Sequence, residues 1–420
     1  MMKVLHVVNS MDPVLGGVSK AVDIIASSLA SEGIINEVVS LDHSEDGFVT
    51  NQAFKWHALG KSTNPWGYNS GLLPWLTVNV AEYDYVIIHG LWLYNSYAVY
   101  KAFKNIRQSK ALSRGTKYLV MPHGMLDPYF QKASGRRVKA IRNWLYWKFI
   151  ESKVVNTSDG LLFTCEEECK LAKEPFKPYN PKNEFIVGLG VEAPPEYHSK
   201  MDEAFFKICK GLENRPFLLF LSRINEKKGV DLLIEAYKKI ILNPSAYFTT
   251  SVEGTSKQIN KEATKAGFEI PALAIVGPGI ETDYGQSLLK TINNHPELKN
   301  NIFFPGMLSG NAKWGAFYNS DAFVLPSHQE NFGIAVVESL ACKKPVLISN
   351  QINIWKEIKN TKAGLVENDT LVGTTTLLAD WMNLSEENKE KMSRQAEVCY
   401  KTCFSIEALV TSWKSKVLDL

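Results

Sequence analysis

The sequence predicts an α/β protein made of two domains. Short apolar runs of strand length alternate, along the whole chain, with longer segments whose apolar residues recur at helical spacing. The chain has 420 residues, 45% hydrophobic and 22% charged, which is enough for two cores without a disordered bias. A polar stretch with two adjacent prolines, between residues 191 and 215, interrupts the alternation. We therefore expect domains over 1–195 and 213–403, followed by a helical segment over 404–420.

The first predicted domain begins with an apolar strand, Val4–Val8, and a loop that runs to Gly17. The apolar face of the next helix is formed by Val18, Ala21, Val22, Ile25, Ala26 and Leu29. Gly16 and Gly17 open this helix. Paired glycines let the backbone approach a phosphate or a sugar closely, although a plain tight turn explains them equally well.

Two later strands of this half end in the same pair of residues. Val86–Gly90 and Tyr118–Gly124 are each an apolar strand that closes with His-Gly, which places His89 and His123 at strand ends facing a ligand cleft. A lone histidine is more often a hydrogen-bonded structural residue than a catalyst. The pattern alone leaves both roles open.

The second predicted domain starts with a buried-type strand, Phe217–Arg223, and a helix whose apolar residues begin at Val230. Arg223 and Lys228 flank the loop between them. Open α/β sheets bind ligands at the carboxyl ends of strands, where Arg and Lys supply a bidentate and a point-charge contact to phosphate. Two solvated cations are the competing interpretation.

The next strand, Ala272–Val276, runs into Gly277-Pro278-Gly279, a tight glycine turn. A lone Gly-x-Gly is weak support for a nucleotide site. Thr282 stands where a dinucleotide fingerprint has its third glycine, so a nicotinamide or flavin cofactor is poorly supported.

Glu330 and Glu338 lie on either side of a predicted helix start. A short buried strand over 322–325 is stopped by a proline, and Ile334–Ala341 reads as an apolar helix, so Gly333 sits at a strand-to-helix turn. Free N–H groups and the positive end of the helix dipole favour an anion such as a diphosphate there. Taken alone, the two carboxylates are also explained by dipole compensation and by a solvated helix face.

Together these motifs resemble those of the retaining, family 4 glycosyltransferases. The matching series, in chain order, is Ser-Arg-Ile with Lys-Lys-Gly, Val-Gly-Pro-Gly, Phe-Phe-Pro-Gly, Asp-Ala-Phe-Val-Leu-Pro-Ser, Glu330 and Glu338. The resemblance covers nearly the whole chain, with the more specific motifs in the second half. It implies the glycosyltransferase-B fold, in which two Rossmann-like domains face each other across a cleft and the terminal helix crosses back to the first domain. Residues 185–192 depart from it, because relatives have a Pro-Asn-Gly-Val turn there.

The resemblance also assigns roles to individual residues. Arg223 and Lys228 are expected to bind the donor diphosphate, and Glu330 to contact hydroxyls of the transferred sugar. Glu338 is expected to hold the ribose, and His123 to contact the sugar near the reacting carbon. Catalysis is thus assigned to His123, Glu330, Arg223 and Lys228, without a protein nucleophile, because the family is commonly described by a front-face route in which the departing phosphate takes the acceptor proton.

The remaining donor contacts are expected from glycines and backbone amides, namely those of Gly16, Gly17, Gly277, Asn331, Phe332, Gly333 and Ile334. His89 is a weaker candidate, on the acceptor side. The two cations and the helix start would stabilise the leaving diphosphate by themselves, so we expect no bound metal and no cofactor besides the sugar nucleotide.

The segment Pro122–Pro128 resembles a branch of bacterial enzymes that build extracellular or envelope polysaccharides. It implies a hexosyltransferase that moves glucose from UDP-glucose, or a related UDP-hexose, to a saccharide or lipid-linked oligosaccharide. Two alternatives remain. One is an enzyme of the same fold with another donor, such as GDP-mannose, and the other is a non-catalytic sugar-nucleotide or glycan-binding protein.

Composition limits the partners. A net charge of +3 gives no electrostatic basis for a nucleic-acid partner. There is no apolar run of membrane-spanning length and no signal peptide, so we expect a cytoplasmic protein. The six cysteines are expected to be reduced and structural.

Two further segments stand out. Residues 136–149 are basic and aromatic, as expected of a helix at a lipid interface, and a lipid-linked acceptor would make contact with the inner face of the membrane useful. We favour the alternative that the aromatics pack in the core and the cations are solvated, because such a helix needs a buried face. Residues 243–271 are polar and poor in periodicity, and we predict a surface insertion there.

Overall fold

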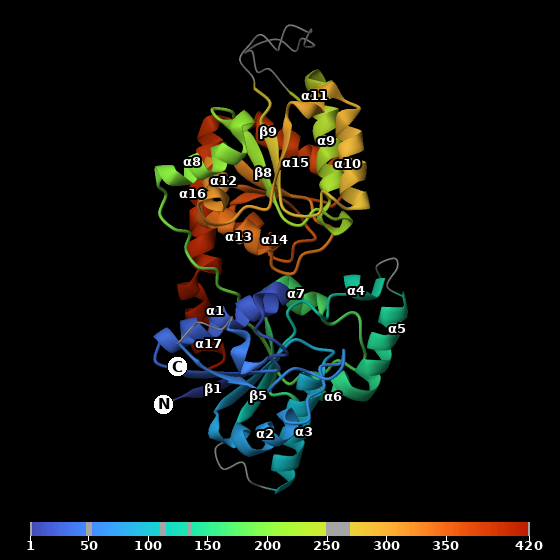
Figure 1. Cartoon of the computed structure of the whole chain (residues 1–420), viewed down its shortest axis with the longest axis vertical. Helices are drawn as coiled ribbons and strands as arrows, with labels where there is room; N and C mark the ends of the chain where they lie inside the picture. The colour runs from blue at the N-terminus through green and yellow to red at the C-terminus, as the bar shows by residue number, and fades with distance from the viewer. Residues whose placement is uncertain (1, 48–52, 110–114, 133–136, 249–268, 419–420) are drawn as a thin grey trace. The chain divides into compact units, whose positions relative to one another are not determined.

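The computed structural model describes residues 2–47, 53–109, 115–132, 137–248 and 269–418. The chain divides into two compact units, each with its own parallel sheet (Figure 1). The first comprises Met1–Gly190 with Ile406–Leu420, and the second comprises Val191–Ser405. The chain thus changes units after residues 190 and 405.

The first unit contains a seven-stranded parallel sheet in the order β3-β2-β1-β4-β5-β6-β7. Its strands are β1 (Lys3–Val7), β2 (Ile35–Ser40), β3 (Lys55–Ala58), β4 (Tyr85–His89), β5 (Lys117–Met121), β6 (Gly160–Phe163) and β7 (Glu184–Ile186). The order reverses between β1 and β4, as in doubly wound sheets, so the loops after these two strands diverge at the carboxyl edge.

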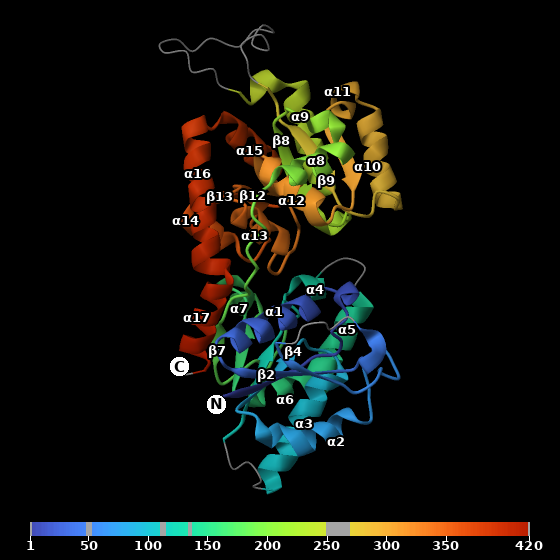
Figure 2. The ribbon, with the colours of Figure 1, turned by 60° about the vertical axis from the view of Figure 1, so that its left-hand side comes forward.

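Helices cover both faces of this sheet (Figures 1 and 2). They are α1 (Gly17–Ser31), α2 (Leu72–Asn79), α3 (Tyr94–Ser109), α4 (Tyr129–Lys132), α5 (Arg137–Tyr146), α6 (Ser152–Thr157), α7 (Glu166–Leu171) and α17 (Ile406–Lys416). In both views α1 and α17 lie on one face, and α2, α3 and α6 on the other. The predicted apolar face of α1 is confirmed, since Val22, Ile25 and Leu29 are fully buried.

The C-terminal helix α17 packs within the first unit. Lys414 forms an ion pair with Glu32, with Nζ and Oε2 2.8 Å apart, and the Tyr85 hydroxyl donates to the carbonyl of Val417 at 2.9 Å. Trp413 is completely buried. These contacts hold the C-terminal end of the chain against α1 and β4, which lie more than 300 residues earlier in the sequence.

The second unit contains a six-stranded parallel sheet in the order β10-β9-β8-β11-β12-β13. Its strands are β8 (Phe217–Leu221), β9 (Ala272–Val276), β10 (Ile302–Gly306), β11 (Ala322–Leu325), β12 (Val346–Ser349) and β13 (Gly364–Glu367). Its helices are α8 (Ser199–Ile208), α9 (Val230–Leu242), α10 (Asp283–Asn293), α11 (Pro296–Lys299), α12 (Gly310–Asn319), α13 (Ile334–Ala341), α14 (Trp355–Thr361), α15 (Leu371–Asn383) and α16 (Glu386–Cys399).

The central strands of this sheet are continuous apolar runs because helices bury both of their faces. Leu218, Leu219 and Phe220 of β8 are fully buried, and so are the five residues of β9 to within 1%. Helices α9 and α15 pack together, and α8 packs against α12. With every strand parallel, the loops after β8, β9 and β11 meet at one edge of the sheet.

The structure corrects one sequence-based preference. The basic aromatic segment 136–149, of which Arg136 lies outside the described residues, was expected to bury its aromatics. Trp147 is indeed buried, but Trp144 and Phe149 are 52% and 60% exposed. The helix buries only one narrow face, so several apolar residues remain in solvent.

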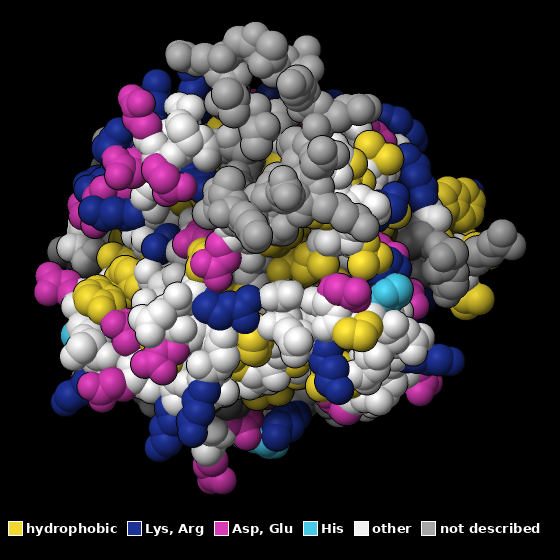
Figure 3. Space-filling view, turned by 90° about the horizontal axis from the view of Figure 1, so that it is seen from above, with side chains coloured by type: hydrophobic (Ala, Val, Ile, Leu, Met, Phe, Trp, Pro, Cys, Tyr) yellow, Lys and Arg dark blue, Asp and Glu magenta, His cyan; other side chains and the backbone are white. Residues whose placement is uncertain are grey.

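Three further observations concern the surface. Most of the predicted insertion over 243–271 lies outside the described residues. The described part of this segment includes a short 3-10 turn at Pro244–Ala246. In the described parts of the chain, no helix is both long and apolar enough to span a bilayer. Acidic and basic side chains are interspersed over the face seen in Figure 3, as a net charge of +3 suggests.

Candidate functional site

The loop between β8 and α9 carries Arg223 and Lys228. Lys228 is only 8% exposed, although lysines are rarely buried without a partner. It lies in a single 3-10 turn, Glu226–Lys228, after which Gly229 adopts a left-handed conformation with φ 66° and caps α9. A Cβ at Gly229 would lie 2.2 Å from the carbonyl oxygen of Pro326, so only glycine allows this close approach.

The partner of Lys228 is Glu330, which follows β11. The Lys228 Nζ and a Glu330 carboxylate oxygen form an ion pair, and the two side chains are 10% and 22% exposed. The Glu330 backbone is pinned on both sides, because its N–H donates to Gln351 at 3.0 Å and its carbonyl accepts from Asn353 at 3.0 Å. This carboxylate is therefore held on rigid backbone beside a buried ammonium group.

The glycine turn after β9 packs directly on the β8 loop. Gly277 has φ 139°, and a Cβ there would lie 1.9 Å from the carbonyl oxygen of Ser222. The N–H of Ile224 donates to the carbonyl of Pro278 at 2.8 Å. The predicted glycine turn thus brings two loops together backbone to backbone, which leaves no room for a side chain between them.

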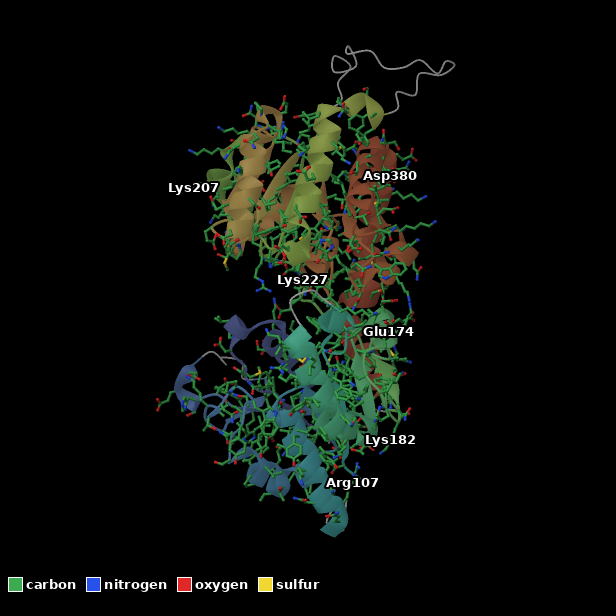
Figure 4. All side chains as sticks on the ribbon, turned by 90° about the vertical axis from the view of Figure 1, so that its right-hand side faces the viewer. Arg107, Glu174, Lys182, Lys207, Lys227 and Asp380 are labelled. Atoms are coloured by element: carbon green, nitrogen blue, oxygen red, sulfur yellow. The ribbon has the colours of Figure 1, made fainter. Side chains whose placement is uncertain are left out.

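The β8 loop is joined to the β11 loop as well. The N–H of His328 and the hydroxyl of Ser327 both donate to the carbonyl of Lys227, at 2.8 Å and 3.0 Å. Figure 4 shows Lys227 at the end of the second unit opposite Lys207 and Asp380, that is, at the carboxyl edge of the sheet. Three loops therefore converge around Lys228 and Glu330.

Helix α13 begins directly beside this pair. Gly333 caps the helix, and the N–H groups of Gly333, Ile334 and Ala335 form no hydrogen bond with any described residue. They are free to meet an anion at the positive end of the helix. Phe332 is 4% exposed and packs edge to face on Phe404, so its side chain belongs to the core and only its backbone can contact a ligand.

Glu338, one turn into α13, is also paired. It is 5% exposed, and its Oε1 lies 2.7 Å from the Nζ of Lys313, a residue of α12. Lys313 lies over the ring of Trp314, with Nζ 4.6 Å from the centroid. Lys313 was not predicted as a site residue, because it lies 25 residues from its partner in the chain and in no motif.

Arg223 and Asn225 complete the β8 loop. Arg223 is exposed and makes no ion pair with a described residue. It lies in the same loop as Lys228 but does not share the carboxylate partner of that lysine. The Asn225 Oδ1 atom is buried and has no hydrogen-bond partner within the described ranges. Asn331 accepts a hydrogen bond from the Asn353 amide at 3.2 Å.

In the first unit, Gly16 and Gly17 lie where the sequence predicts, at the start of α1. Gly16 is its cap, with φ 131°, and a Cβ at either glycine would meet no atom within 4 Å. The loop before them is fixed by Asp12, whose carboxylate accepts from the N–H of Val14 at 2.8 Å. These glycines therefore leave open space at a helix start.

Three histidines form a hydrogen-bonded row across neighbouring strands of this unit. His6 of β1, His89 of β4 and His123 after β5 are joined by two contacts of 2.9 Å between ring nitrogens. At the inner end, His6 Nε2 lies 3.0 Å from Oδ1 of Asn36, in β2. His89 and His123 were predicted at strand ends, which is confirmed, but His6 was missed.

Burial keeps this row uncharged. It lowers the pKa of His6 and of His123 to about 4, and the Asn36 hydrogen bond only partly opposes this for His6. Burial also lowers the pKa of His89 well below its ordinary value, with contributions from the charges of His6 and His123. At neutral pH each ring therefore carries one proton and acts as one donor and one acceptor.

The comparisons with known proteins concern the family and the fold of the chain. Residues 202–398 match the family model described as Glycosyl transferases group 1. This range runs from α8 to α16 and contains Lys228, Glu330 and Glu338. The second unit is therefore a group 1 glycosyl transferase domain.

Among curated proteins, the uncharacterized glycosyltransferase MJ1607 of Methanocaldococcus jannaschii is 25% identical over 256 residues, which are 58% of this chain and 55% of that protein. The D-inositol 3-phosphate glycosyltransferase of Gordonia bronchialis is 24% identical over 253 residues, which are 59% and 48% of the two chains. The chain spans about half the length of the curated relatives it matches.

Solved structures resemble the whole chain. HepE of Anabaena, in complex with UDP and glucose, has a TM-score of 0.65 at 16% identity, with 100% of both chains covered. Sucrose-phosphate synthase of Thermosynechococcus elongatus has a TM-score of 0.64 at 14% identity and covers 99% of this chain and 98% of its own. At such identities the likeness concerns the fold, and it is the glycosyltransferase-B fold predicted from the sequence.

Proposed function

We propose that this protein is a retaining glycosyltransferase that moves a hexose from a nucleotide diphosphate sugar to a hydroxyl group. The observation that carries the proposal is the partly buried Lys228–Glu330 ion pair beside the free N–H groups at the start of α13. A buried cation and a helix start favour a diphosphate, and a fixed carboxylate next to them suits sugar hydroxyls. The match to the group 1 glycosyl transferases supports the same activity.

The proposed reaction breaks the bond between the anomeric carbon and the diphosphate oxygen, and forms a bond from that carbon to the acceptor oxygen on the same face. The acceptor proton passes to the leaving phosphate oxygen. Negative charge develops on the diphosphate, where Lys228, Arg223 and the α13 amides stabilise it. Each preorganised donor of this kind supplies about 2–4 kcal/mol. Because these groups suffice, the proposal requires no bound metal.

Glu330 and Glu338 have different proposed roles. Glu330 accepts hydrogen bonds from hydroxyls of the transferred sugar, and Glu338 accepts from the ribose. In the structure each carboxylate is neutralised by a lysine, Lys228 and Lys313 respectively. When the donor binds, hydrogen bonds to its sugar and phosphate groups would replace these ion pairs. Neither the carboxylates nor the lysines would then be left without a partner.

We propose UDP-glucose, or a related UDP-hexose, as donor, and a saccharide or lipid-linked oligosaccharide in polysaccharide synthesis as acceptor. The donor is supported by HepE, which has the same fold and was crystallised with UDP-glucose. The acceptor is supported by the Pro122–Pro128 segment of the sequence. His123 is proposed to contact the transferred sugar, and His89 to act on the acceptor side.

A donor series tests the proposal. Purified protein is incubated in EDTA with UDP-glucose, UDP-galactose or GDP-mannose and a mixture of saccharide and polyprenyl-linked acceptors, and nucleotide release is measured. We expect acceptor-dependent release of UDP, lost in Lys228→Ala, and a product with the α configuration of the donor. Release of GDP alone would assign a GDP-mannose-type transferase. Tight nucleotide binding without release from any mixture would assign a binding protein.

A further inference from the structure

An exposed apolar surface runs along α5 and the π-helical turn that follows it, Trp147–Glu151. Figure 1 shows α5 at the right-hand edge of the first unit. Five large apolar side chains are between 44% and 82% exposed here and form what we call the apolar stripe: Val138, Ile141, Trp144, Leu145 and Phe149. Contiguous exposed apolar residues mark interaction sites, whereas single ones are ordinary.

The packing of the helix does not need this stripe. Asn143 and Trp147 already form a buried face, with exposed fractions of 9% and 1%. Trp147 stacks on Phe176, with ring centroids 5.0 Å apart and an interplanar angle of 18°. The apolar stripe is therefore a second apolar face, and folding of the unit leaves it in water.

The charge along this segment has one sign. Residues 137–150 contain no Asp or Glu, and the next acid, Glu151, is fully buried. Lys139, Arg142 and Lys148 are exposed between the apolar residues. Lys148 Nζ lies 5.4 Å from the ring centroid of Trp144 and 5.9 Å from that of Phe149, so a cation lies next to two of the apolar side chains.

We propose that the apolar stripe inserts into the surface of a bilayer that contains anionic lipids. Aromatic and aliphatic side chains bordered by lysines and an arginine fit the boundary between acyl chains and headgroups, where the long cationic side chains reach the phosphates. A second copy of the same face fits poorly, because symmetric pairing would bring the cations of both copies together. The inference stands on this surface and does not depend on the proposed function.

Vesicle flotation of the full chain tests the proposal. The probes are vesicles of phosphatidylcholine alone and of phosphatidylcholine with one quarter phosphatidylglycerol, at low and at physiological salt. The apolar variant is Trp144→Ser with Phe149→Ser, and the charge variant is Lys139→Gln with Lys148→Gln. The matched control is Val78→Ser with Met307→Ser, which removes side chains that are 75% and 77% exposed elsewhere.

We expect the wild type to float with anionic vesicles, and the apolar variant to bind at least about tenfold more weakly at an unchanged unfolding midpoint. The charge variant should bind more weakly at low salt and lose most of the salt dependence. The control should bind as the wild type does. Failure of the wild type to bind anionic vesicles, or equal binding by the apolar variant, overturns the proposal. So does self-association that the apolar variant abolishes, because it assigns the stripe to a second copy.

A different observation carries a second inference, which rests on the proposed role of His123. The Asn36 amide is oriented by the backbone, because its Nδ2 donates to the carbonyl of Ile34 at 2.9 Å. Its Oδ1 must then accept from Nε2 of His6. A neutral His6 that carries its proton on Nε2 can only accept at Nδ1, so Nε2 of His89 donates to it. His89 is then left with Nδ1 as its acceptor, so Nε2 of His123 donates to Nδ1 of His89.

The geometry assigns Asn36, His6 and His89 as positioning residues that hold His123 in one tautomer. The Nε2 atom of His123 carries the proton, and Nδ1 is left as an acceptor for a hydroxyl of the substrate. Asn36 cannot take up a proton, so the row fixes an orientation and does not conduct protons.

Nitrogen NMR of protein labelled in its histidines reads the tautomer without any substrate. We expect His123 to be the Nε2–H form in the wild type and in Asn36→Asp, which keeps an acceptor oxygen. In Asn36→Leu the acceptor is lost, and we expect a mixture containing the Nδ1–H form, with turnover at saturating donor about tenfold lower and UDP affinity unchanged. An unchanged Nε2–H form in a folded Asn36→Leu variant overturns the assignment. Because the spectra need no turnover, that failure is distinct from failure of the proposed function.

Discussion

Replacing Glu330 by Gln should separate nucleotide binding from sugar transfer. In the structure the carboxylate of Glu330 pairs with Lys228, the cation proposed to bind the donor diphosphate. UDP lacks the transferred sugar that Glu330 is proposed to contact, so the carboxylate opposes its binding in two ways. It competes for the lysine, and it repels the phosphates. Glu330→Gln keeps the shape and an amide oxygen but removes the charge.

The size of the effect follows from the geometry. A phosphate within hydrogen-bond reach of Lys228 lies roughly 6 Å from the Glu330 carboxylate, where two unit charges interact by about 3 kcal/mol at an effective dielectric constant of about 20. The Glu330 side chain is 22% exposed, so water and salt weaken this repulsion. We therefore take the repulsion between the carboxylate and the phosphate as about 1 kcal/mol. Such a change is about fivefold in Kd.

Calorimetric titration with UDP and with GDP, in EDTA, measures this change. We expect Glu330→Gln to bind its nucleotide about fivefold more tightly than the wild type, while turnover of the sugar nucleotide falls at least about tenfold. Glu226→Gln is the matched control, since it removes an exposed carboxylate from the same loop as Lys228, and its Kd should change less than about twofold. Equal or weaker nucleotide binding by Glu330→Gln would refute the assigned competition.

Three other outcomes are expected. Lys228→Ala should lower turnover about 100-fold or more, measured as UDP release, because a preorganised donor to the leaving group is lost. Gly277→Ala should lower the free energy of unfolding in urea by more than about 2 kcal/mol, because its Cβ would lie 1.9 Å from the Ser222 carbonyl, whereas Gly17→Ala meets no atom and should change little. Burial raises the pKa of the Glu151 carboxyl to about 7, so the folded state binds this proton more tightly than the unfolded state does. The free energy of unfolding should therefore fall as pH rises from about 4.5 to about 7, and Glu151→Gln should remove this fall. An unchanged pH profile of the unfolding midpoint in Glu151→Gln would contradict this prediction.

Much of the fold was predictable because parallel strands buried on both faces are short apolar runs that differ sharply from helices. The Ala272–Val276 strand begins and ends as predicted, and the strand that begins at Phe217 ends at Leu221, two residues before the predicted end. The start of α13 at Ile334 was predictable from the glycine and the apolar run after it. Parallel order then brings the ends of neighbouring strands together, which places Lys228 and Glu330 near each other.

Other features of the sites depend on distant pairs. Lys313 meets Glu338 across two helices, and no periodicity signals such a contact. His6 lies in an ordinary apolar strand, and only the strand order β2-β1-β4-β5 aligns it with the histidines at the ends of β4 and β5. The signal for His6 is its position as a polar residue in an apolar strand that pairs directly with β4, which ends in His89.

The exposure of α5 could not be predicted for a different reason. Its sequence has enough apolar residues for two faces, and composition does not say which face packs inward. Trp147 finds Phe176 in the folded unit, whereas Trp144, three residues earlier, points to solvent. Only the packing of the neighbouring segments decides between them.

The most direct test of the central claim is thermal unfolding with UDP, GDP, ADP or NAD, in EDTA. A ligand that binds only the folded protein raises the unfolding midpoint in proportion to RT ln(1 + [L]/Kd). A nucleotide-sugar donor site in the second unit predicts a rise with UDP, a smaller one with the other nucleotides, and no rise for Lys228→Ala. No rise with any nucleotide, or an equal rise in Lys228→Ala, would contradict it.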